Sequence, residues 1–343
     1  MKTPRLTALL ALLPFFAASS IAVHAESFRP TFDLWPQQTG FNGYIQTLAG
    51  SYREKGLVTA HKDNREISSR VRTQRESDSD FLIFNWSAAY HFNRNNTRIF
   101  IATPDDELND VALPLETGIS HMLPNETILT LSYRPKLNSS KTWQDPYLIG
   151  EKRSRTEILT EAVRLSSEYI FGTPISLIYD YGQQSFEHDH AGESLSGRLS
   201  QAEVKQLQRD QAIQRVHVSL TLPIRKNIYF IPEVDYTDVN AEGDANSYTA
   251  TRIEMTLFAH FRKFELFVYA YHDNRRYRQH HPFFNTKRQD GVKGFAAGYS
   301  YLAPFDWHNT SFDFVIGGNL HNSNIGFYEQ NNAFMAFGFT YKY

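Results

Sequence analysis

The sequence of 343 residues contains no cysteine, which excludes disulfide bonds, thiol chemistry and cysteine metal sites. Neither sign of charge dominates, because 35 Lys and Arg stand against 37 Asp and Glu and the formal net charge is -2. Such a balanced chain has no basic field to attract nucleic acid. The sequence also contains no P-loop, dinucleotide-binding fingerprint, EF-hand or HExxH pattern, so we expect no cofactor.

Long hydrophobic runs are absent after residue 25, where no stretch reaches the about 18 consecutive apolar residues of a transmembrane helix. Residues 1–25 are predicted to be a secretory signal peptide. Lys2 and Arg5 precede an apolar run, and the tripeptide ending at Ala25 fits a small-x-small cleavage site. We therefore expect cleavage near Ala25 and export, with residues 26–41 as a periplasmic lead-in.

Aromatic residues are abundant, since 26 Phe, 19 Tyr and 4 Trp make up 14% of the chain. The mean hydropathy of -0.46 is typical of a soluble protein. It is also compatible with a membrane barrel, because lipid-facing and lumen-facing residues alternate and the average conceals both. Many of the aromatic residues lie near the ends of apolar strand patterns, where girdles of rings meet lipid headgroups.

The last eleven residues, 333–343, have a clear period-two pattern. Because alternate side chains of a strand point to opposite faces, one face is aromatic and apolar and the other is small or polar. The apolar row is Ala333, Met335, Phe337, Phe339, Tyr341 and Tyr343, and the other row is Phe334, Ala336, Gly338, Thr340 and Lys342. This pattern resembles the closing strand of a bacterial outer-membrane β-barrel, in which a terminal aromatic residue is the assembly signal. The alternative is an ordinary strand of a soluble sandwich.

Fourteen segments have strand patterns, and twelve is the alternative count because residues 97–103 and 115–123 are weak. The expected strands are residues 42–52, 81–92, 97–103, 115–123, 127–134, 158–171, 175–185, 212–222, 228–236, 249–261, 264–272, 291–302, 311–320 and 333–343. We expect the last strand to pair with residues 311–320 on one side and to close the barrel against residues 42–52 on the other.

The connections alternate between two kinds. Counted from a periplasmic N-terminus, the odd connections are long or polar: 53–80, 104–114, 135–157, 186–209, 238–247, 273–290 and 321–332. The even connections are short: 93–96, 124–126, 172–174, 223–227, 262–263 and 303–309. Short periplasmic turns and long outer loops are typical of outer-membrane barrels. The sequence therefore predicts an all-β fold, a transmembrane antiparallel up-and-down β-barrel over residues 42–343.

Charged residues and histidines interrupt several strand patterns, mostly on the face opposite the apolar row. A charge on the lipid face near the midplane costs about 2–4 kcal/mol, so these side chains are predicted to face the lumen. The pore-lining candidates are Arg215, His217, Glu233, Asp235, Arg252, Glu254 and His260, and Glu161, Arg164 and Glu168 share this placement. They line a solute pathway in one interpretation and form ion pairs that rigidify a narrow barrel in the other. Their mixed signs predict no strong ion selectivity.

Two polar segments contain motifs that suggest chemistry. Residues 321–324, His-Asn-Ser-Asn, resemble the His-x-Ser-Asn signature of outer-membrane phospholipase A, in which His and Ser form a nucleophile–base pair. Here the motif lies in the last predicted outer loop and candidate assisting residues Asn331 and Asn332 have a different spacing, so no catalytic residue is assigned and no enzyme is predicted. Residues 188–190 and 280–281 contain closely spaced histidines. Exposed loop histidines are usually solvated, and no metal site is predicted.

Two stretches resemble a known family. Residues 143–153 are Trp-Gln-Asp-Pro-Tyr-Leu-Ile-Gly-Glu-Lys-Arg, and residues 169–181 are Tyr-Ile-Phe-Gly-Thr-Pro-Ile-Ser-Leu-Ile-Tyr-Asp-Tyr. They are similar to the DUF2860 family of proteobacterial envelope proteins. The resemblance implies an outer-membrane β-barrel without an assigned biochemical role, and it transfers no catalytic residue. Residues 145–147 and 151–153 are predicted to form a structured loop that folds back into the lumen.

The sequence thus favours a bacterial outer-membrane β-barrel that is a passive channel or porin for small solutes, with loops that restrict the lumen. The alternative is a non-conducting barrel whose outer loops bind a ligand or partner, and a phospholipase-like hydrolase is a distant third. The expected partners are outer-membrane lipid and lipopolysaccharide, and the barrel-assembly machinery through the C-terminal strand. No nucleic-acid partner is expected, and the sequence indicates no oligomeric state.

Overall fold

A computed structural model describes residues 35, 38–71, 76–104, 115–136 and 139–343. Within these residues a single sheet is accompanied by short 3-10 helices and one short α-helix. None of the helices in these ranges is long and apolar enough to cross a bilayer. The predicted signal peptide and its cleavage site lie outside the described residues, and so does most of the predicted lead-in.

The sheet contains sixteen strand segments among the described residues. They are β1 (Gly40–Gly56), β2 (Glu76–Phe92), β3 (Thr97–Ala102), β4 (Glu116–Met122), β5 (Ile128–Arg134), β6 (Ser139–Trp143), β7 (Arg155–Glu168), β8 (Ile175–Phe186), β9 (Gln211–Leu220), β10 (Leu222–Arg225), β11 (Ile228–Ala241), β12 (Tyr248–His260), β13 (Phe264–His281), β14 (Thr286–Leu302), β15 (Thr310–Ser323) and β16 (Gln330–Lys342). The helices are α1 (Gln201–Lys205), η2 (Lys62–Asn64), η3 (Asn93–Asn95), η4 (Ile170–Gly172), η5 (Glu193–Leu195), η6 (Asp244–Asn246), η7 (Pro304–Asp306) and η8 (Gly326–Tyr328).

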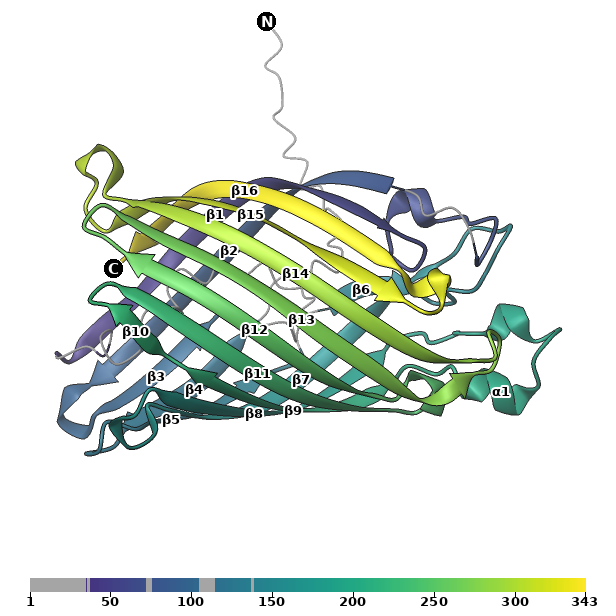
Figure 1. The fold of residues 1–343 in the computed structure, drawn as a ribbon, viewed down its shortest axis with the longest axis horizontal. Helices are drawn as coiled ribbons and strands as arrows, with labels where there is room; N and C mark the ends of the chain where they lie inside the picture. Colours follow the sequence, from purple (N-terminus) through teal and green to yellow (C-terminus); the bar gives the residue numbers. More distant parts are fainter. Residues whose placement is uncertain (1–34, 36–37, 72–75, 105–114, 137–138) are drawn as a thin grey trace, which may run out of the picture.

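The sheet closes into a barrel of fourteen strands (Figure 1). Segments β5 and β6 both pair with β7, and β9 and β10 both pair with β11, so each couple is one interrupted strand of the wall. The first strand pairs antiparallel with the last, from Tyr44 opposite Lys342 to Gly56 opposite Gln330. All neighbours are antiparallel, and the ring of strands closes on itself. Toward the long-loop end and among the described residues, residues 76–85 of β2 pair only with β1, and β6 pairs only with β7. The predicted barrel, its fourteen strands and its closing pair are confirmed.

The two ends of the barrel differ. The connections β2–β3, β4–β5, β7–β8, β10–β11, β12–β13 and β14–β15 form a short-turn end, which lies on the left in Figure 1 with the C-terminus. The other connections, with α1, form a long-loop end on the right. The predicted asymmetry of the connections is therefore confirmed.

Several strands extend further toward the long-loop end than the sequence predicts. Strands β13 and β14 pair as far as His281 opposite Thr286, so most of the predicted loop 273–290 is a continuous hairpin. Residues 139–143 form β6 inside the predicted loop 135–157. The alternation of apolar and polar residues fades in these extensions because both their faces are polar, whereas the backbone hydrogen bonds continue.

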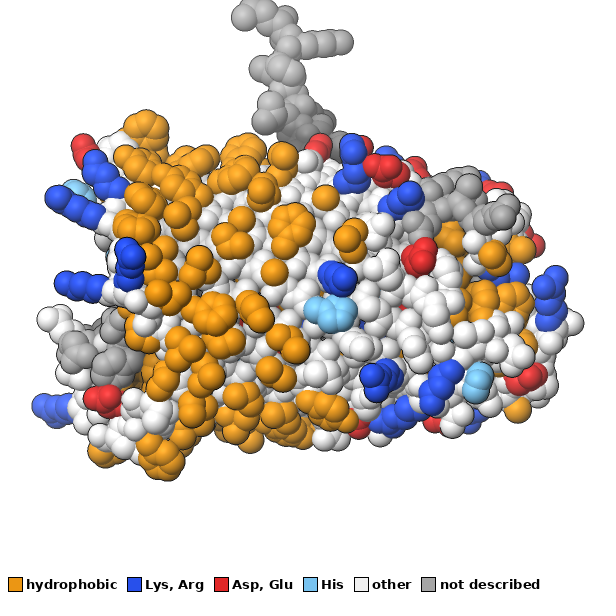
Figure 2. Space-filling model, in the orientation of Figure 1, with side chains coloured by type: hydrophobic (Ala, Val, Ile, Leu, Met, Phe, Trp, Pro, Cys, Tyr) orange, Lys and Arg blue, Asp and Glu red, His pale blue; other side chains and the backbone are white. Residues whose placement is uncertain are grey.

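On the face that Figure 2 shows, apolar side chains cover the outer surface from the short-turn end to the middle of the barrel. On β16, Phe337 is 54% exposed, whereas its neighbours Ala336 and Gly338 are buried. Aromatic rings pair near the short turns, as in Phe41 with Tyr90 at 4.7 Å between centroids. We call this surface the apolar belt. Because exposed apolar residues lie on strands all around the closed ring, the structure is built to span a membrane.

Candidate functional site

A buried carboxylate on the inner wall joins three strands. Asp180 of β8 has only 1% of its side chain exposed. Arg164 of β7 donates from Nε to Asp180 Oδ1 at 2.7 Å, and Arg215 of β9 donates from Nη2 to Oδ2 at 2.7 Å. Both arginines face Asp180 directly in the strand register. Paired charge-assisted hydrogen bonds of this kind compensate the desolvation of the carboxylate.

The next charged group along the wall is an imidazole between two carboxylates. His217 of β9 lies 3.1 Å from Glu233 and 2.9 Å from Asp235, with a different ring nitrogen toward each. Both acids belong to β11, and Asp235 is directly opposite His217 in the register. On its other side Asp235 is opposite Arg252 of β12, so the polar contacts continue across a fifth strand.

Arg252 continues these contacts toward the far side of the barrel. It donates to Glu254 at 2.6 Å, and its guanidinium carbon lies 3.6 Å from the centroid of the Tyr271 ring. The Tyr271 hydroxyl of β13 then donates to Asn319 of β15 at 2.7 Å. A cation over an aromatic face and a hydrogen-bonded hydroxyl thus extend the polar wall onto β13 and β15, which also present apolar residues such as Phe267 and Val315 inward.

A similar ion pair extends the polar wall in the other direction. Arg134 of β5 donates to Glu116 of β4 at 2.9 Å. Ser132, two residues before Arg134, is directly opposite Arg164. We call the whole set the inner polar ladder. It comprises Glu116, Ser132, Arg134, Arg164, Asp180, Arg215, His217, Glu233, Asp235, Arg252, Glu254, Tyr271 and Asn319.

Six of the seven predicted pore-lining residues lie in the inner polar ladder. The seventh, His260, is near the short-turn end and pairs with Glu265 at 2.8 Å. The ladder contains four arginines, five carboxylates and one histidine, so neither sign of charge dominates. The sequence did not single out Asp180 because the pattern of its strand was dominated by the apolar row.

Part of the inner wall is apolar, which the sequence did not predict. Phe258 and Leu48 are fully buried on the inward rows of β12 and β1, and Phe267 is 4% exposed on β13. These residues belong to one cluster, which comprises Leu48, Ile231, Phe258, Phe267, Ala296, Val315 and Ala336. On these strands both rows are rich in apolar residues, so hydrophobic patterning could not distinguish an inward phenylalanine from an outward one.

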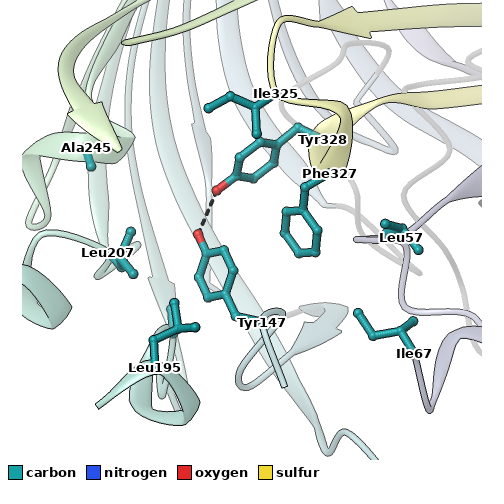
Figure 3. Packing of buried hydrophobic residues seen from close by; sticks show 10 residues of the cluster. Leu57, Ile67, Tyr147, Leu195, Leu207, Ala245, Ile325, Phe327 and Tyr328 are labelled. Atoms are coloured by element: carbon teal, nitrogen blue, oxygen red, sulfur yellow. Dashed lines mark hydrogen bonds between the residues drawn. The ribbon is translucent and has the colours of Figure 1, made fainter. Parts of the chain in front are cut away.

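At the long-loop end, connections from all around the barrel share one hydrophobic core (Figure 3). Its buried members come from the β1–β2, β6–β7, β8–β9, β11–β12 and β15–β16 connections, and are Leu57, Ile67, Tyr147, Ala191, Leu195, Leu207, Ala245, Ile325, Phe327 and Tyr328. The β1–β2 and β8–β9 connections start on opposite sides of the wall. A core that includes both must therefore span the mouth of the barrel. We call this assembly the loop cap.

Arg153 holds two loops of the cap together. Its side chain is fully buried and donates to the carbonyl oxygens of Leu57 and Pro146 at 3.0 Å and to that of Asn64. Its guanidinium carbon lies 4.4 Å from the centroid of Trp143. Burial lowers the pKa of Arg153 to about 9, and the nearby Asp145 carboxylate opposes this shift. The guanidinium therefore remains charged at neutral pH.

Trp143 and Asp145 connect the same segment to further loops. The Trp143 indole N–H donates to the Thr59 carbonyl at 2.9 Å. The Asp145 carboxylate accepts from the backbone N–H groups of Gly192 at 3.2 Å and Ser194 at 2.8 Å. The predicted structured loop at residues 143–153 is thus a centre of the cap, and its buried side chains contact other loops at the mouth.

A chain of polar groups joins the cap to the wall. The hydroxyl of Tyr147 lies 2.6 Å from that of Tyr328 and 3.0 Å from Nε2 of His281 (Figure 3 shows the two tyrosines). Burial raises the pKa of both tyrosines, so both hydroxyls remain protonated. Arg288 of β14 lies over the Tyr328 ring at 3.5 Å and donates to Asp290 at 2.6 Å.

The motif at residues 321–324 differs from its predicted setting. It begins within β15 instead of a loop, and His321 Nε2 is 2.9 Å from Asp290. Ser323 Oγ accepts from the backbone N–H of Ile325 at 3.2 Å. Each side chain thus has a structural partner. His188 and His190 have ring centroids 6.5 Å apart, and the part of the chain that the structure describes contains no group of three or more metal-ligating side chains.

Several solved structures of bacterial outer-membrane proteins have a related shape. The outer membrane channel DcaP of Acinetobacter baumannii matches with a TM-score of 0.44 and 8% identity, covering 89% of this chain and 97% of that one. The loop L8 deletion mutant of OmpT of Vibrio cholerae gives 0.41 and 10%, covering 89% and 99%. The anion-selective porin from Comamonas acidovorans gives 0.41 and 8%, with the same coverage. With scores this low, the assignment of the fold rests on the strand pairing.

Sequence comparison identifies the family but no characterised relative. No curated protein matches the sequence. Residues 40–342 match the family described as a protein of unknown function, DUF2860. This match spans the whole wall and the cap, including both stretches at 143–153 and 169–181. The chain is therefore an outer-membrane-type β-barrel that belongs to the DUF2860 family.

Proposed function

We propose that this protein is a passive outer-membrane channel for small polar solutes, whose mouth is narrowed by the loop cap. The observation that carries the proposal is the inner polar ladder, which places charged and hydrogen-bonding groups around much of the inner wall at mid-height. Buried ion pairs add little stability to a wall that no solute passes, because well-packed apolar residues in their place would make the protein equally or more stable.

The size of the barrel is consistent with this proposal. Side chains alone fill barrels of about eight strands, whereas barrels of about 16–18 strands leave an aqueous channel. A wall of fourteen strands lies between these limits, so its interior holds water or inserted chain. The loop cap supports a narrow passage and therefore small solutes. The balanced charges of the ladder support weak selectivity between anions and cations.

The proposal includes the position of the chain in the envelope. The predicted signal peptide at 1–25 exports it, and the short-turn end faces the periplasm, as in other bacterial barrels. The long-loop end then faces outward. We expect β16, with its exposed aromatic row, to be recognised by the barrel-assembly machinery, and the apolar belt to contact outer-membrane lipid and lipopolysaccharide.

Conductance in planar bilayers tests the proposal. Refolded protein is expected to give small channel events in salt, and Arg153→Ala is expected to give larger ones because it removes the guanidinium that joins two loops of the cap. The matched control is Lys152→Ala, which removes a neighbouring exposed charge and should leave the conductance unchanged. Heat-modifiable migration in gels verifies that each variant is folded.

A second function is favoured by the shared core of the cap. Loops that only narrow a channel do not need a common hydrophobic core, so the cap also fits a rigid surface that binds a ligand or partner. Absence of channel events in both the unmodified protein and Arg153→Ala would overturn the channel and leave this non-conducting barrel as the function.

A further inference from the structure

A row of basic side chains lies on the outer surface of the β13–β14 hairpin. It consists of His272, Arg276, His280, Lys287 and Lys293, all of which are exposed. His272 is directly opposite Lys293, and His280 is directly opposite Lys287, so the two strands contribute to one continuous stripe. Figure 1 shows both strands on the facing side of the barrel. We call these five residues the basic stripe.

The neighbours of the basic stripe carry no compensating charge. On β12, Arg276 is opposite Thr249, and on β15, Lys293 is opposite Leu320. The acidic residues of the hairpin at the level of the stripe, Asp273 and Asp290, are buried on the inward row and pair with Arg275 and Arg288. Among the described residues, no side chain of the stripe forms an ion pair.

Two arginines elsewhere on the outer surface have acidic partners. Arg53 of β1 lies 3.2 Å from Glu76 and 2.7 Å from Asp78 on β2. Arg278, which shares the outward row of β13, pairs with Asp238 of β11. The barrel thus provides acidic partners for outer arginines elsewhere but leaves the basic stripe without them. Uncompensated positive charge attracts an anionic partner from outside the chain.

The stripe begins where the apolar belt ends. Along the outward row of β13, Val268 and Ala270 precede His272, and Val268 is 52% exposed. Along β14, the 57% exposed Phe295 lies two residues from Lys293. In Figure 2 a basic side chain and a histidine lie side by side at this boundary. Lipid headgroups occupy this level of a membrane barrel, and their acyl chains contact the belt below.

We propose that the basic stripe binds a lipid of the outer leaflet that carries more than one phosphate. Lysines supply point charges for phosphate, and Arg276 supplies a planar guanidinium that binds two phosphate oxygens at once. The eight residue steps from His272 to His280 extend roughly 25 Å along the strand, enough for separated phosphates on one headgroup. This inference rests on the outward orientation proposed above and is independent of conduction.

Native mass spectrometry of the full barrel in detergent tests the inference. Diphosphorylated lipid A is the probe, and its dephosphorylated form is the chemical control. The variant is Arg276→Gln/Lys287→Gln/Lys293→Gln, which removes three exposed charges without touching the interior. We expect its affinity for the phosphorylated probe to fall about tenfold or more, since each basic side chain near an anionic lipid surface contributes substantially to binding.

The matched control removes the same types of charge at the other end of the barrel. Arg225→Gln/Lys226→Gln/Lys263→Gln changes one arginine and two lysines that are also exposed, beside the short turns. Its affinity for the probe should stay within about twofold of the unmodified protein. Because binding in detergent does not depend on orientation in a membrane or on channel events, failure here is distinguishable from failure of the proposed function.

Five outcomes would overturn the inference. They are equal binding by the stripe variant and the unmodified protein, an equal loss in the control variant, and equal binding of the phosphorylated and dephosphorylated probes. The fourth is a dimer in lipid-free samples that the stripe variant abolishes, which would assign the stripe to a second copy of the chain. Millimolar inorganic phosphate should compete only weakly, and the fifth outcome, complete displacement, would point to free phosphate instead of a lipid.

Discussion

Protonation of a buried side chain can make the stability of the loop cap depend on pH, and His61 is the clearest example. Its side chain is 4% exposed, and Nδ1 accepts from the backbone N–H of Asp63 at the start of η2. Burial lowers the pKa of His61, while the nearby Asp63 carboxylate opposes the shift. The neutral imidazole is therefore the form that the folded cap favours, and protonation removes an acceptor at the helix start.

The sign of the resulting pH dependence follows from linkage. Because the folded pKa lies below the unfolded value of about 6.5, the unfolded loop binds more protons in the intervening range. The stabilisation is complete above about pH 6.5 and is lost as the pH falls below it. We predict that hydrogen-exchange protection factors for residues 57–67 are lower at pH 5 than at pH 7.5.

A variant isolates the contribution of His61. In His61→Gln the side chain no longer titrates, so the difference in protection between the two pH values should become smaller. An unchanged difference would assign the acid sensitivity to other groups of the cap. Overall loss of the fold is monitored by the protection of the β1–β16 pair, which should stay constant.

The stability of a whole strand depends on its outward row, because each outward residue must suit its depth in the membrane. Phe337 on β16 is 54% exposed within the apolar belt. We predict that Phe337→Arg lowers the free energy of unfolding in lipid vesicles by about 2–4 kcal/mol, because a charge near the midplane of a barrel is placed against hydrocarbon. Urea titration of the reconstituted barrel measures this change.

The same strand supplies the control for depth. Asn331 lies on the same outward row near the long-loop end and is also exposed. Asn331→Arg should change the free energy of unfolding by about 1 kcal/mol or less, since the penalty declines toward the interface. Equal costs at both positions would contradict the depth assigned to the belt.

The sequence predicted strands well where lipid contacts one face. All fourteen predicted strands are present, including the weak pair at β3 and β4, because a membrane-facing row enforces a strict period of two. The prediction of strands failed beyond the apolar belt, where β13 continues to His281 and β6 occupies residues 139–143. Both rows of those extensions are largely polar, although the inward row is buried, so the sequence there has no hydrophobic alternation that would predict a strand.

For a similar reason, the sequence predicted the charges of the wall but not the loop cap. Charges such as Arg215 and His217 were recognisable because they interrupt an apolar alternation. The loop cap was not recognisable, because each loop contributes only one to three apolar residues, such as Leu57 or Leu207, and none has a pattern of its own. Its core exists only when the loops meet, and such long-range proximity has no local signal in the chain.

For the whole molecule, the balance of charge along the inner polar ladder determines what the proposed channel selects. Asp180 supplies the negative charge that pairs with two arginines of the wall. We predict that Asp180→Asn shifts the channel toward anions, because Arg164 and Arg215 then present uncompensated positive charge to the lumen. The reversal potential in a salt gradient measures the shift, and its sign should correspond to anion preference.

The exposed acid Asp306 at the short-turn end provides the comparison. Asp306→Asn removes one negative charge outside the wall and should leave the reversal potential nearly unchanged. Because breaking a buried ion pair destabilises proteins by about 3–5 kcal/mol, folding of Asp180→Asn is verified first by heat-modifiable migration. A folded Asp180→Asn channel without a shift would place the ladder outside the conduction path.

The closing pair also sets the order of events during synthesis and assembly. Tyr44 at the start of the wall is paired with Lys342 at its end, so the ring cannot be completed until almost the entire chain has been made and delivered. Contacts between such distant positions form slowly, because the intervening chain must first be brought together. Until that moment β1 and β16 are both open edges, ready to pair with any other strand. The chain therefore has an interval before closure in which these two unpaired edges are open to aggregation.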